Sequence, residues 1–166
     1  MKDYRIVLGL GSNLGDRASY IARAIEAVGR IRHVAVVGRS PLYESEPAGG
    51  PPQGDYLNGA VLIRTPNPLD VVLRHTLQIE RDLGRVRSDE ARWGPRVIDI
   101  DLLWAENEVV DEPGLIVPHP RLGERPFALR PLLDVVPEAW DPVSGVPYAD
   151  LPAASLPLRP YPAGVD

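Results

Sequence analysis

Apolar residues recur along this chain with two different periods, and the order of these periods constrains the fold more than any other feature. Strand-like runs are expected at residues 4–10, 34–38 and 56–65 and near residue 100. Two segments with helical spacing lie between them, at residues 16–29 and 68–83. The order strand, helix, strand, strand, helix, strand is typical of a split βαβ unit, which predicts an antiparallel sheet with helices on one side. The expected fold class is α+β, with a ferredoxin-like arrangement.

Local signals add the ends of these elements and the segments between them. Asp16 is a good N-cap for the first helix, and glycines at 29 and 84 end the two helices. The other expected elements are a loop at residues 44–54 and a turn near Asn107. A short strand is expected near Val109 and a short helix at residues 126–134. The arginine-rich segment 85–96 has no hydrophobic period and is predicted to be a long loop.

Length and proline content predict one domain with an unusual tail. A chain of 166 residues is long enough to bury its own core, and we expect a single domain over residues 1–166. From about residue 141, prolines recur too closely for a long helix or a central strand. The tail is therefore expected to be an extended wrap or a frayed end and not a second domain.

Composition excludes several classes of protein. The net charge is −5 at pH 7, whereas general nucleic-acid binding usually depends on a broad basic surface. There are no cysteines, which excludes disulfides and thiolate metal sites. No apolar stretch is long enough for a signal peptide or a membrane span. We expect a cytoplasmic monomer that acts on small molecules and binds neither nucleic acid nor membrane.

Two aspartates in the last predicted strand mark a candidate metal site. Asp99 and Asp101 are two residues apart, and side chains alternate across a strand, so both carboxylates share one face. Ile98, Ile100 and Leu102 then share the opposite, core-facing side. Two residues of strand advance by about 6.6 Å, so the carboxylates can converge on one divalent ion or a pair of ions, and Mg²⁺ prefers such oxygen ligands. An ordinary solvated strand face is the alternative for an isolated Asp-x-Asp.

Arginines just before this strand favour a site for a metal with phosphate. Guanidinium groups match phosphate oxygens in charge and geometry. The four arginines of this segment are Arg85, Arg87, Arg92 and Arg96. Cations beside a pair of carboxylates suit a bound metal–nucleotide complex, and here they form a local positive field on an acidic chain.

Three other kinds of function share parts of this pattern. A dinucleotide-binding enzyme would need a different spacing from that of Gly9, Gly11 and Gly15, and an acidic residue at the end of the next strand. An RNA-binding module can have the same order of elements, but it is usually basic and places aromatic residues on its central strands. A two-metal phosphohydrolase would use the same Asp99 and Asp101, and it is the main mechanistic alternative.

Eight short motifs, taken in order, resemble one family of enzymes. They are Gly9–Asp16 (GLGSNLGD), Ser40–Pro47 (SPLYESEP), Tyr56–Asn58 (YLN), Ile79–Glu80 (IE), Gly84–Arg87 (GRVR), Arg92–Arg96 (RWGPR), Asp99–Asp101 (DID) and Val117–Pro120 (VPHP). Their order and spacing, over about residues 8–137, are similar to those of the 6-hydroxymethyl-7,8-dihydropterin pyrophosphokinases of folate biosynthesis. The resemblance implies an enzyme that moves pyrophosphate from ATP to a pterin alcohol and leaves AMP.

The resemblance also implies roles on the nucleotide side. In the family, two Mg²⁺ ions are bound with ATP by the aspartates that match Asp99 and Asp101. The arginines that match Arg85 and Arg96 stabilise the transferring group. Positions that the resemblance places near ATP are Glu80, Arg87, Arg92, Leu102, His119 and Arg125.

A pterin is a flat bicycle with an amide-like edge, which favours aromatic stacking and a carboxamide partner. Tyr56 and Phe127 match family positions that stack on the ring, and Asn58 matches one that reads its edge. Trp93 is expected to move over the site on binding. The remaining expected contacts with the pterin are groups of Ser45, Glu46 and Ala48. Aromatic core residues with a satisfied buried amide are the alternative.

Two departures and two alternatives accompany these assignments. Ser45 stands where the family often has threonine and keeps the hydroxyl, and Ser88 stands where some members have a lysine near the phosphates. A surface or capping role is the alternative for Glu80. Support of a turn between prolines is the alternative for His119.

Overall fold

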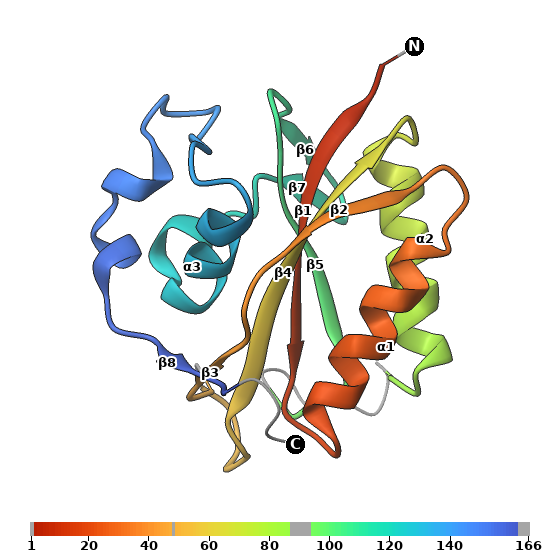
Figure 1. Cartoon of the computed structure of the whole chain (residues 1–166), viewed down its shortest axis with the longest axis vertical. Helices are drawn as coiled ribbons and strands as arrows, with labels where there is room; N and C mark the ends of the chain where they lie inside the picture. The colour runs from red at the N-terminus through yellow and green to blue at the C-terminus, as the bar shows by residue number, and fades with distance from the viewer. Residues whose placement is uncertain (1, 48, 87–93, 163–166) are drawn as a thin grey trace.

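The computed structural model describes residues 2–47, 49–86 and 94–162. Its centre is an antiparallel sheet in the order β5–β1–β4–β3–β8, with β2 also paired to β4 (Figure 1). The strands are β1 Tyr4–Ser12, β2 Ala35–Arg39, β3 Tyr43–Ser45, β4 Tyr56–Thr65, β5 Asp99–Ala105 and β8 Arg159–Pro160. Because β2 and β3 share the place of one strand beside β4, the order is that of the predicted ferredoxin-like arrangement.

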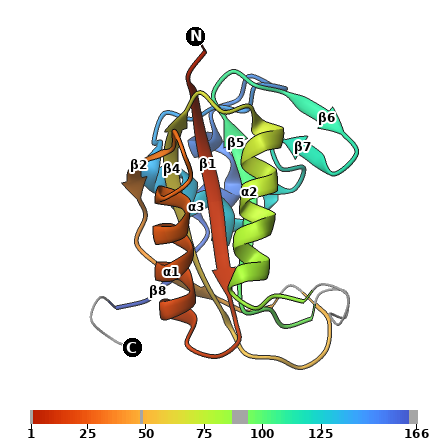
Figure 2. The ribbon, with the colours of Figure 1, turned by 90° about the vertical axis from the view of Figure 1, so that its right-hand side faces the viewer.

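Helices cover both faces of the sheet, which corrects the expectation that they lie on one side. α1 (Arg17–Gly29) and α2 (Leu69–Asp82) lie side by side on one face (Figure 2), and α3 (Pro126–Val135) lies on the other (Figure 1). All three helices were predicted, with ends within one residue of those observed. The Asp16 carboxylate accepts a 3.2 Å hydrogen bond from Ser19 N, which confirms it as the N-cap of α1.

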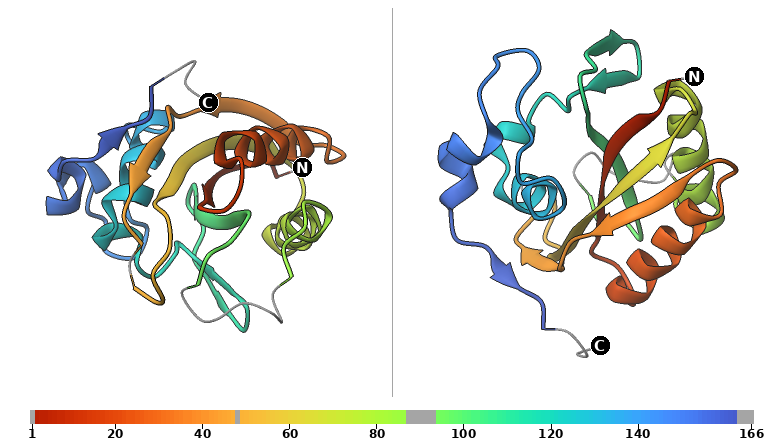
Figure 3. Two further views of the ribbon diagram at one scale, coloured as in Figure 1. Left: turned by 90° about the horizontal axis from the view of Figure 1, so that it is seen from below. Right: turned by 45° about the horizontal axis from the view of Figure 1, so that its top comes forward.

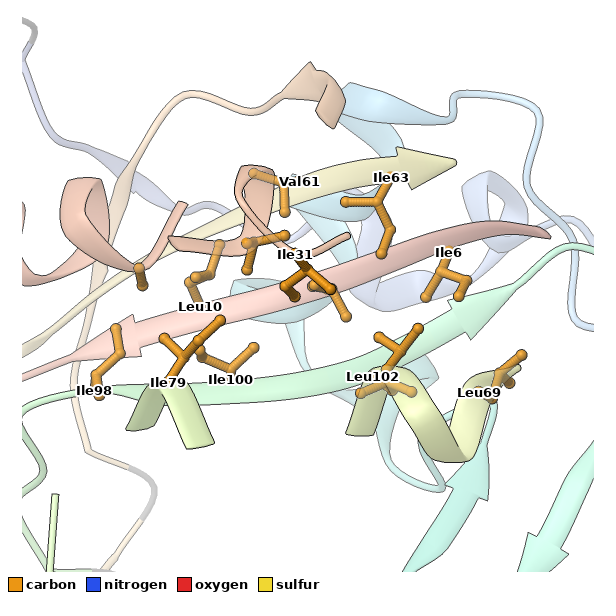
Figure 4. Packing of buried hydrophobic residues seen from close by; sticks show 14 of the residues in the cluster. Ile6, Leu10, Ile31, Val61, Ile63, Leu69, Ile79, Ile98, Ile100 and Leu102 are labelled. Carbon is orange, nitrogen blue, oxygen red and sulfur yellow. The ribbon is translucent and has the colours of Figure 1, made fainter. Parts of the chain in front are cut away.

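The first core fills the space between the sheet and helices α1 and α2. Ile100 and Leu102 of β5 lie there with Leu10 of β1 and Ile79 of α2, and all four are buried (Figure 4). The two β5 residues alternate with the aspartates, so one face of this strand is core, as expected. Burying each such side chain contributes about 1.5–3 kcal/mol, which anchors β5 in its register.

A second core explains why α3 packs on the opposite face. Leu129 and Leu132 of α3 are fully buried. They belong to one cluster with Leu62 of β4 and Trp104 of β5. The Trp104 indole Nε1 donates a 3.0 Å hydrogen bond to Trp140 O, so its polar atom is satisfied at the border of this core. The far face of the sheet is therefore apolar where α3 packs on it.

The strand position beside β4, shared by β2 and β3, is interrupted at Ser40. The Ser40 backbone N–H donates to Ala60 O, and the Ser40 hydroxyl accepts a 2.8 Å hydrogen bond from Ala60 N. This exchange spans the gap between the ladders that β2 and β3 make with β4. The first two residues of segment 44–54 were expected in a loop, but they belong to β3 because they continue the ladder with β4.

After β5 the chain turns at Asn107, as predicted, and that residue has a φ of 59°. The short strand expected near Val109 is β6 (Val110–Glu112), and it pairs with β7 (Leu115–Val117), which was not predicted. The hairpin of β6 and β7 extends beyond the main sheet (Figure 2). A short 3₁₀ helix, Leu122–Glu124, then leads into α3.

The C-terminal tail runs along the rest of the molecule, and two short 3₁₀ helices interrupt its extended path. Tyr148 and Ala153 lie in the short 3₁₀ helices Tyr148–Asp150 and Pro152–Ser155 and are buried in the core under α3. The tail then runs along the molecule to β8, which pairs with β3 at the edge of the sheet (Figure 3). Among the helices of the described residues, none is both long enough and apolar enough to cross a membrane.

Candidate active site

One cavity gathers most of the predicted site residues that the structure describes. It lies where β4 and β5 begin and β1 approaches its end, next to the start of α3. Its volume is about 320 Å³, within the range of small-molecule sites. The predicted residues that line it are Ser45, Glu46, Tyr56, Asn58, Arg96, Asp99, Asp101, Arg125 and Phe127.

Asp99 and Asp101 line this cavity beside two glycines of β1. The register pairs Gly11 with Asp99 and Gly9 with Asp101. A Cβ added at Gly11 would lie 3.6 Å from Asn58 Oδ1, so a larger side chain would enter the cavity there. The absent side chains leave room for a ligand next to the carboxylates. Neither glycine was expected as a site residue, although glycine inside a strand pattern often marks a close approach.

A buried charge network holds Asp99. Arg85 is 4% exposed, and its Nη1 donates to Asp99 Oδ1 at 2.9 Å and to Glu80 Oε2 at 3.0 Å. Glu80 is 1% exposed, and the same Oε2 accepts a 2.8 Å hydrogen bond from Ile100 N. Glu80 belongs to α2 and Asp99 to β5, so the network fixes the helix, the arginine and the strand relative to one another. Removing one partner would leave another charge buried, which is costly.

Asn13, just after β1, holds the backbone at Arg96. Arg96 N donates a 2.8 Å hydrogen bond to Asn13 Oδ1, and Asn13 N donates to Arg96 O at 3.1 Å. The Asn13 amide nitrogen donates to Gln53 Oε1 at 2.7 Å and to Gly54 O at 3.1 Å. Arg96 Nη1 lies 3.5 Å from Asp99 Oδ2. Asn13 was not expected as a site residue, because its partners are far away in the sequence.

The environment of Asp101 makes its ionisation unfavourable. The pKa of Asp101 is raised from 3.8 to about 8, first by burial and then by the negative charges of Asp99 and Glu80. Arg125 and Arg96 offset part of this effect. The site therefore concentrates negative charge that a bound cation would stabilise.

This shift predicts how pH affects the stability of the metal-free protein. The folded state keeps a proton that the unfolded chain releases near pH 4, so the free energy of unfolding should fall as pH rises from about 4 to about 8. Asp101→Asn should weaken this dependence, because the amide does not titrate. Urea unfolding in a chelator, at several pH values for both proteins, measures the difference. The same pH dependence in both proteins would contradict the assignment.

Arg125 lines the cavity, whereas His119 does not line it but lies near enough to feel the charges of Arg125 and Asp99. The Arg125 guanidinium lies 5.7 Å from the centre of the Phe127 ring. His119 Nδ1 accepts a 3.2 Å hydrogen bond from Arg121 N, which places the proton of the neutral ring on Nε2. Burial and then the charge of Arg125 lower the pKa of His119. The lowered pKa favours the neutral imidazole, which presents Nε2–H as a donor.

Another part of the cavity is lined by aromatic rings and an amide. Tyr56 of β4 and Phe127 of α3 both line it. Asn58 is buried, and its Nδ2 donates to Ser45 Oγ at 2.8 Å and to Tyr43 O at 3.3 Å. Because the amide hydrogens have these partners, Oδ1 is the Asn58 atom suited to accept a hydrogen bond from a ligand.

The other predicted residues lie elsewhere. Glu80 and Arg85 are in the buried network and do not line the cavity. The Leu102 side chain lies in the first core, so only its backbone is suited to contact a nucleotide. The predicted residues outside the described part of the chain are Ala48, Arg87, Arg92 and Trp93.

The available donors suit Mg²⁺ that arrives with a nucleotide. Asp99 and Asp101 offer carboxylate oxygens, which are ligands of hard cations. Within residues 2–47, 49–86 and 94–162, no cluster of three or more His, Asp or Glu could hold a metal ion. Mg²⁺ usually keeps waters and takes phosphate oxygens in addition to one or two carboxylates. The aspartate pair fits that pattern.

The fold is α+β, and its cavity brings a pair of carboxylates together with arginines, a combination suited to a metal-bound nucleotide. Residues 7–137 match the family of 7,8-dihydro-6-hydroxymethylpterin-pyrophosphokinase (HPPK). The chain belongs to this family.

Two relatives show the extent of the similarity in sequence. Both are 2-amino-4-hydroxy-6-hydroxymethyldihydropteridine pyrophosphokinases. The one from Bacillus subtilis is 44% identical over 129 residues, which cover 77% of this chain and 75% of the relative. The one from Methylorubrum extorquens is 45% identical over 134 residues, which cover 81% of this chain and 84% of the relative. Each alignment thus covers most of this chain and most of the relative.

Among solved structures, wild-type Plasmodium falciparum HPPK-DHPS with pteroate is similar in fold. The TM-score is 0.67 and the identity 15%, over 89% of this chain and 43% of that chain. This chain therefore spans less than half the length of that protein. At this identity the likeness shows the fold alone, and it agrees with the ferredoxin-like order of strands.

Proposed function

We propose that the chain transfers pyrophosphate from ATP to 6-hydroxymethyl-7,8-dihydropterin, as its family membership indicates, in folate biosynthesis. The pterin hydroxyl oxygen bonds to the β-phosphorus and its proton passes to solvent, while the bond from that phosphorus to the α-phosphate oxygen breaks and AMP leaves. The observation that carries the proposal is a single cavity that contains the Asp99–Asp101 pair together with Asn58 and Phe127. Such a cavity can place a nucleotide and a flat heterocycle side by side.

The metal requirement follows from the same aspartates. Mg²⁺, as two ions with ATP, would be held by Asp99 and Asp101. When bound, the ions neutralise phosphate charge and orient the attacking and leaving oxygens. The raised pKa of Asp101 supports this role, since a carboxylate in such a place is best stabilised by a cation.

Each side chain around the pair then has a role in positioning or charge. Arg96 contacts Asp99 from the cavity, and Arg85 contacts it from the buried side. The Arg96 guanidinium suits the charge that builds up on the transferring group, and Arg85, which does not line the cavity, would supply its charge from behind Asp99. Arg125 and the Nε2–H of His119 provide charge and a donor for the nucleotide. Arg87, Arg92 and the backbone at Leu102 complete the proposed nucleotide side, and Glu80 supports it from the buried network with Arg85.

The proposed pterin side consists of the aromatic and amide-lined part of the cavity. Tyr56 and Phe127 offer ring faces, and Asn58 Oδ1 accepts a hydrogen bond from the ring edge. The proposal also includes Ser45, Glu46, Ala48 and Trp93 as contacts. No residue is assigned as a dedicated general base for the pterin hydroxyl.

The remaining parts of the proposal concern the whole protein. We propose a single domain over residues 1–166 that works as a cytoplasmic monomer. Its partners are ATP and the pterin alcohol, without nucleic acid or membrane. The net charge of −5 supports small-molecule substrates over nucleic acid.

Asn58→Ala tests the pterin side directly. The variant loses the acceptor for the ring edge and leaves Ser45 Oγ without its amide partner, so pterin affinity should fall by about 10–100-fold. A fluorescence titration of the pterin, with α,β-methylene-ATP and Mg²⁺ present, measures it. The affinity for the nucleotide should change less than about threefold. Unchanged pterin affinity would contradict the assignment of this subsite.

A further inference from the structure

Between β3 and β4, the described residues 46–47 and 49–54 form a wall segment at the edge of the cavity. Glu46, Pro47 and Gly49 of this wall segment line the cavity. The segment is rich in proline and glycine and lies between the end of one strand and the start of the next. Its position therefore depends on how its two ends are held.

Arg159, from the C-terminal tail, reaches both ends of the wall segment. Its Nη2 donates to Asp55 Oδ2 at 2.7 Å and lies 3.9 Å from Glu44 Oε2. Glu44 precedes the wall segment and Asp55 follows it. The guanidinium of Arg159 thus connects the residues on either side of this segment.

The backbone of the tail holds Arg159 in this position. β8 pairs antiparallel with β3, with Glu44 opposite Arg159, and Tyr161 N donates a 2.9 Å hydrogen bond to Leu42 O. In Figure 1, β8 lies directly beside β3 at the outer edge of the sheet. The tail therefore adds a strand at the point where the wall segment begins.

A second arginine, Arg17 of α1, joins the same contacts. Its Nη1 donates to Glu44 Oε2 at 3.1 Å and to Asp55 O at 3.1 Å. Its guanidinium also lies 5.8 Å from the centre of the Tyr161 ring. Two arginines from distant parts of the chain thus bind the same two ends, and Tyr161 of the tail contacts one of them.

We propose that Arg159 is a positioning residue for the pterin, acting through the wall segment. The tail strand sets the distance between Glu44 and Asp55, and hence the place of Ser45 and Glu46 at the cavity and of Tyr56 beyond it. Arg159 lies outside residues 7–137, the part that matches the family. The inference rests on the pterin subsite proposed above.

The contacts predict an effect on one substrate only. The wall segment adjoins the proposed pterin side and reaches Arg96 indirectly, through Asn13, whereas Asp99 and Arg85 are held by the network with Glu80. Exposed ion pairs are weak, and the Arg159 side chain is 59% exposed, so a moderate effect is expected. Loss of Arg159 should raise KM for the pterin and leave kcat and KM for ATP unchanged.

The experiment compares Arg159→Ala with a matched control, Arg64→Ala. Arg64 is 58% exposed and pairs with Asp3 at 2.6 Å, away from the cavity lining. In steady-state assays, the KM of Arg159→Ala for the pterin should be about threefold to fivefold above that of the wild type. Its kcat and its KM for ATP should stay within about twofold of the wild-type values. Arg159→Lys should recover part of the loss, and Arg64→Ala should change none of the three constants.

A double-mutant cycle with Asp55→Asn tests the route of the effect. If Arg159 acts through Asp55, the double variant should have a KM for the pterin no higher than that of the worse single variant. Fully multiplicative effects would overturn that route, and a pterin KM unchanged in Arg159→Ala would overturn the whole inference. An equal rise in KM for ATP, or the same changes in Arg64→Ala, would also overturn it.

The Asn58→Ala variant separates the two proposals. If Asn58→Ala loses pterin affinity and Arg159→Ala does not, only the role of Arg159 fails. If Asn58→Ala keeps full pterin affinity, the subsite itself is misplaced and the inference fails with it.

Discussion

Asp101→Ala is expected to lower kcat about a thousandfold or more while the protein stays folded. The substitution removes one of the two carboxylates that would hold Mg²⁺, and metal ions contribute several kcal/mol of charge stabilisation to phosphoryl transfer. Each 1.36 kcal/mol is a factor of ten in rate. Stopped-time assays of AMP formation at saturating substrates, with thermal unfolding of the same samples, measure both effects.

Asp99→Ala should lose activity to a similar degree but differ in stability. Asp99 is a partner of the buried Arg85, so its removal leaves the buried cation paired with Glu80 but no longer with Asp99. Asp101 has no such buried arginine bond among the described residues, and its charge is itself unfavourable in the folded state. The melting temperature at pH 8 should therefore fall for Asp99→Ala and not for Asp101→Ala.

A matched control and a clear limit complete this test. Asp111→Ala removes an exposed carboxylate on β6 and should keep wild-type kcat. If Asp101→Ala retains more than about a tenth of the wild-type activity, less than about 1.4 kcal/mol of barrier is lost and the metal role is wrong.

Glu80→Ala is expected to impair both stability and turnover, although Glu80 does not line the cavity. The change leaves Arg85 buried without one of its carboxylates and leaves Ile100 N without its acceptor. Breaking a buried ion pair in this way costs about 3–5 kcal/mol. Because Arg85 and β5 then lose their contacts with Glu80, kcat should fall about 10–100-fold, as is found when residues that orient metal ligands are removed. Urea unfolding and initial rates measure the two effects.

Glu80→Gln separates positioning from folding. The amide oxygen can still accept from Ile100 N, but the charge opposite Arg85 is lost, so a smaller loss of stability is expected. If Glu80 acts through Arg85 and Asp99, kcat should fall about tenfold with KM for ATP changed less than threefold. A rise in KM for ATP with kcat unchanged would indicate direct nucleotide contact instead. Glu26→Gln, on the exposed side of α1, is the control.

Much of the fold follows from local patterns in the sequence. The period of apolar residues and the capping residue Asp16 were enough for α1, α2 and α3 and for most strands. The face covered by α3 was not predicted, because a helical stripe does not tell which partner it meets. A signal was present in β1, where Ile6, Val7 and Leu8 are all fully buried, since a strand covered on both faces is apolar without alternation.

The site was predictable where its residues are close in the sequence. The shared face of Asp99 and Asp101 follows from the alternation of a strand alone. The Glu80–Arg85–Asp99 network and the contacts of Asn13 join separate elements, and no local period indicates them. The contact of Arg159 with Asp55 spans 104 residues and depends on the path of the tail. Proline spacing left two forms of the tail open, an extended wrap and a frayed end.

The most direct test of the central claim is the nucleotide product formed from ATP, Mg²⁺ and 6-hydroxymethyl-7,8-dihydropterin. Products separated by chromatography, with and without the pterin, give the answer in one experiment. Formation of AMP that requires the pterin, in equal amount to the pterin diphosphate, is the predicted result. ADP or free phosphate formed without the pterin would contradict it and would favour a phosphohydrolase that uses the same two aspartates.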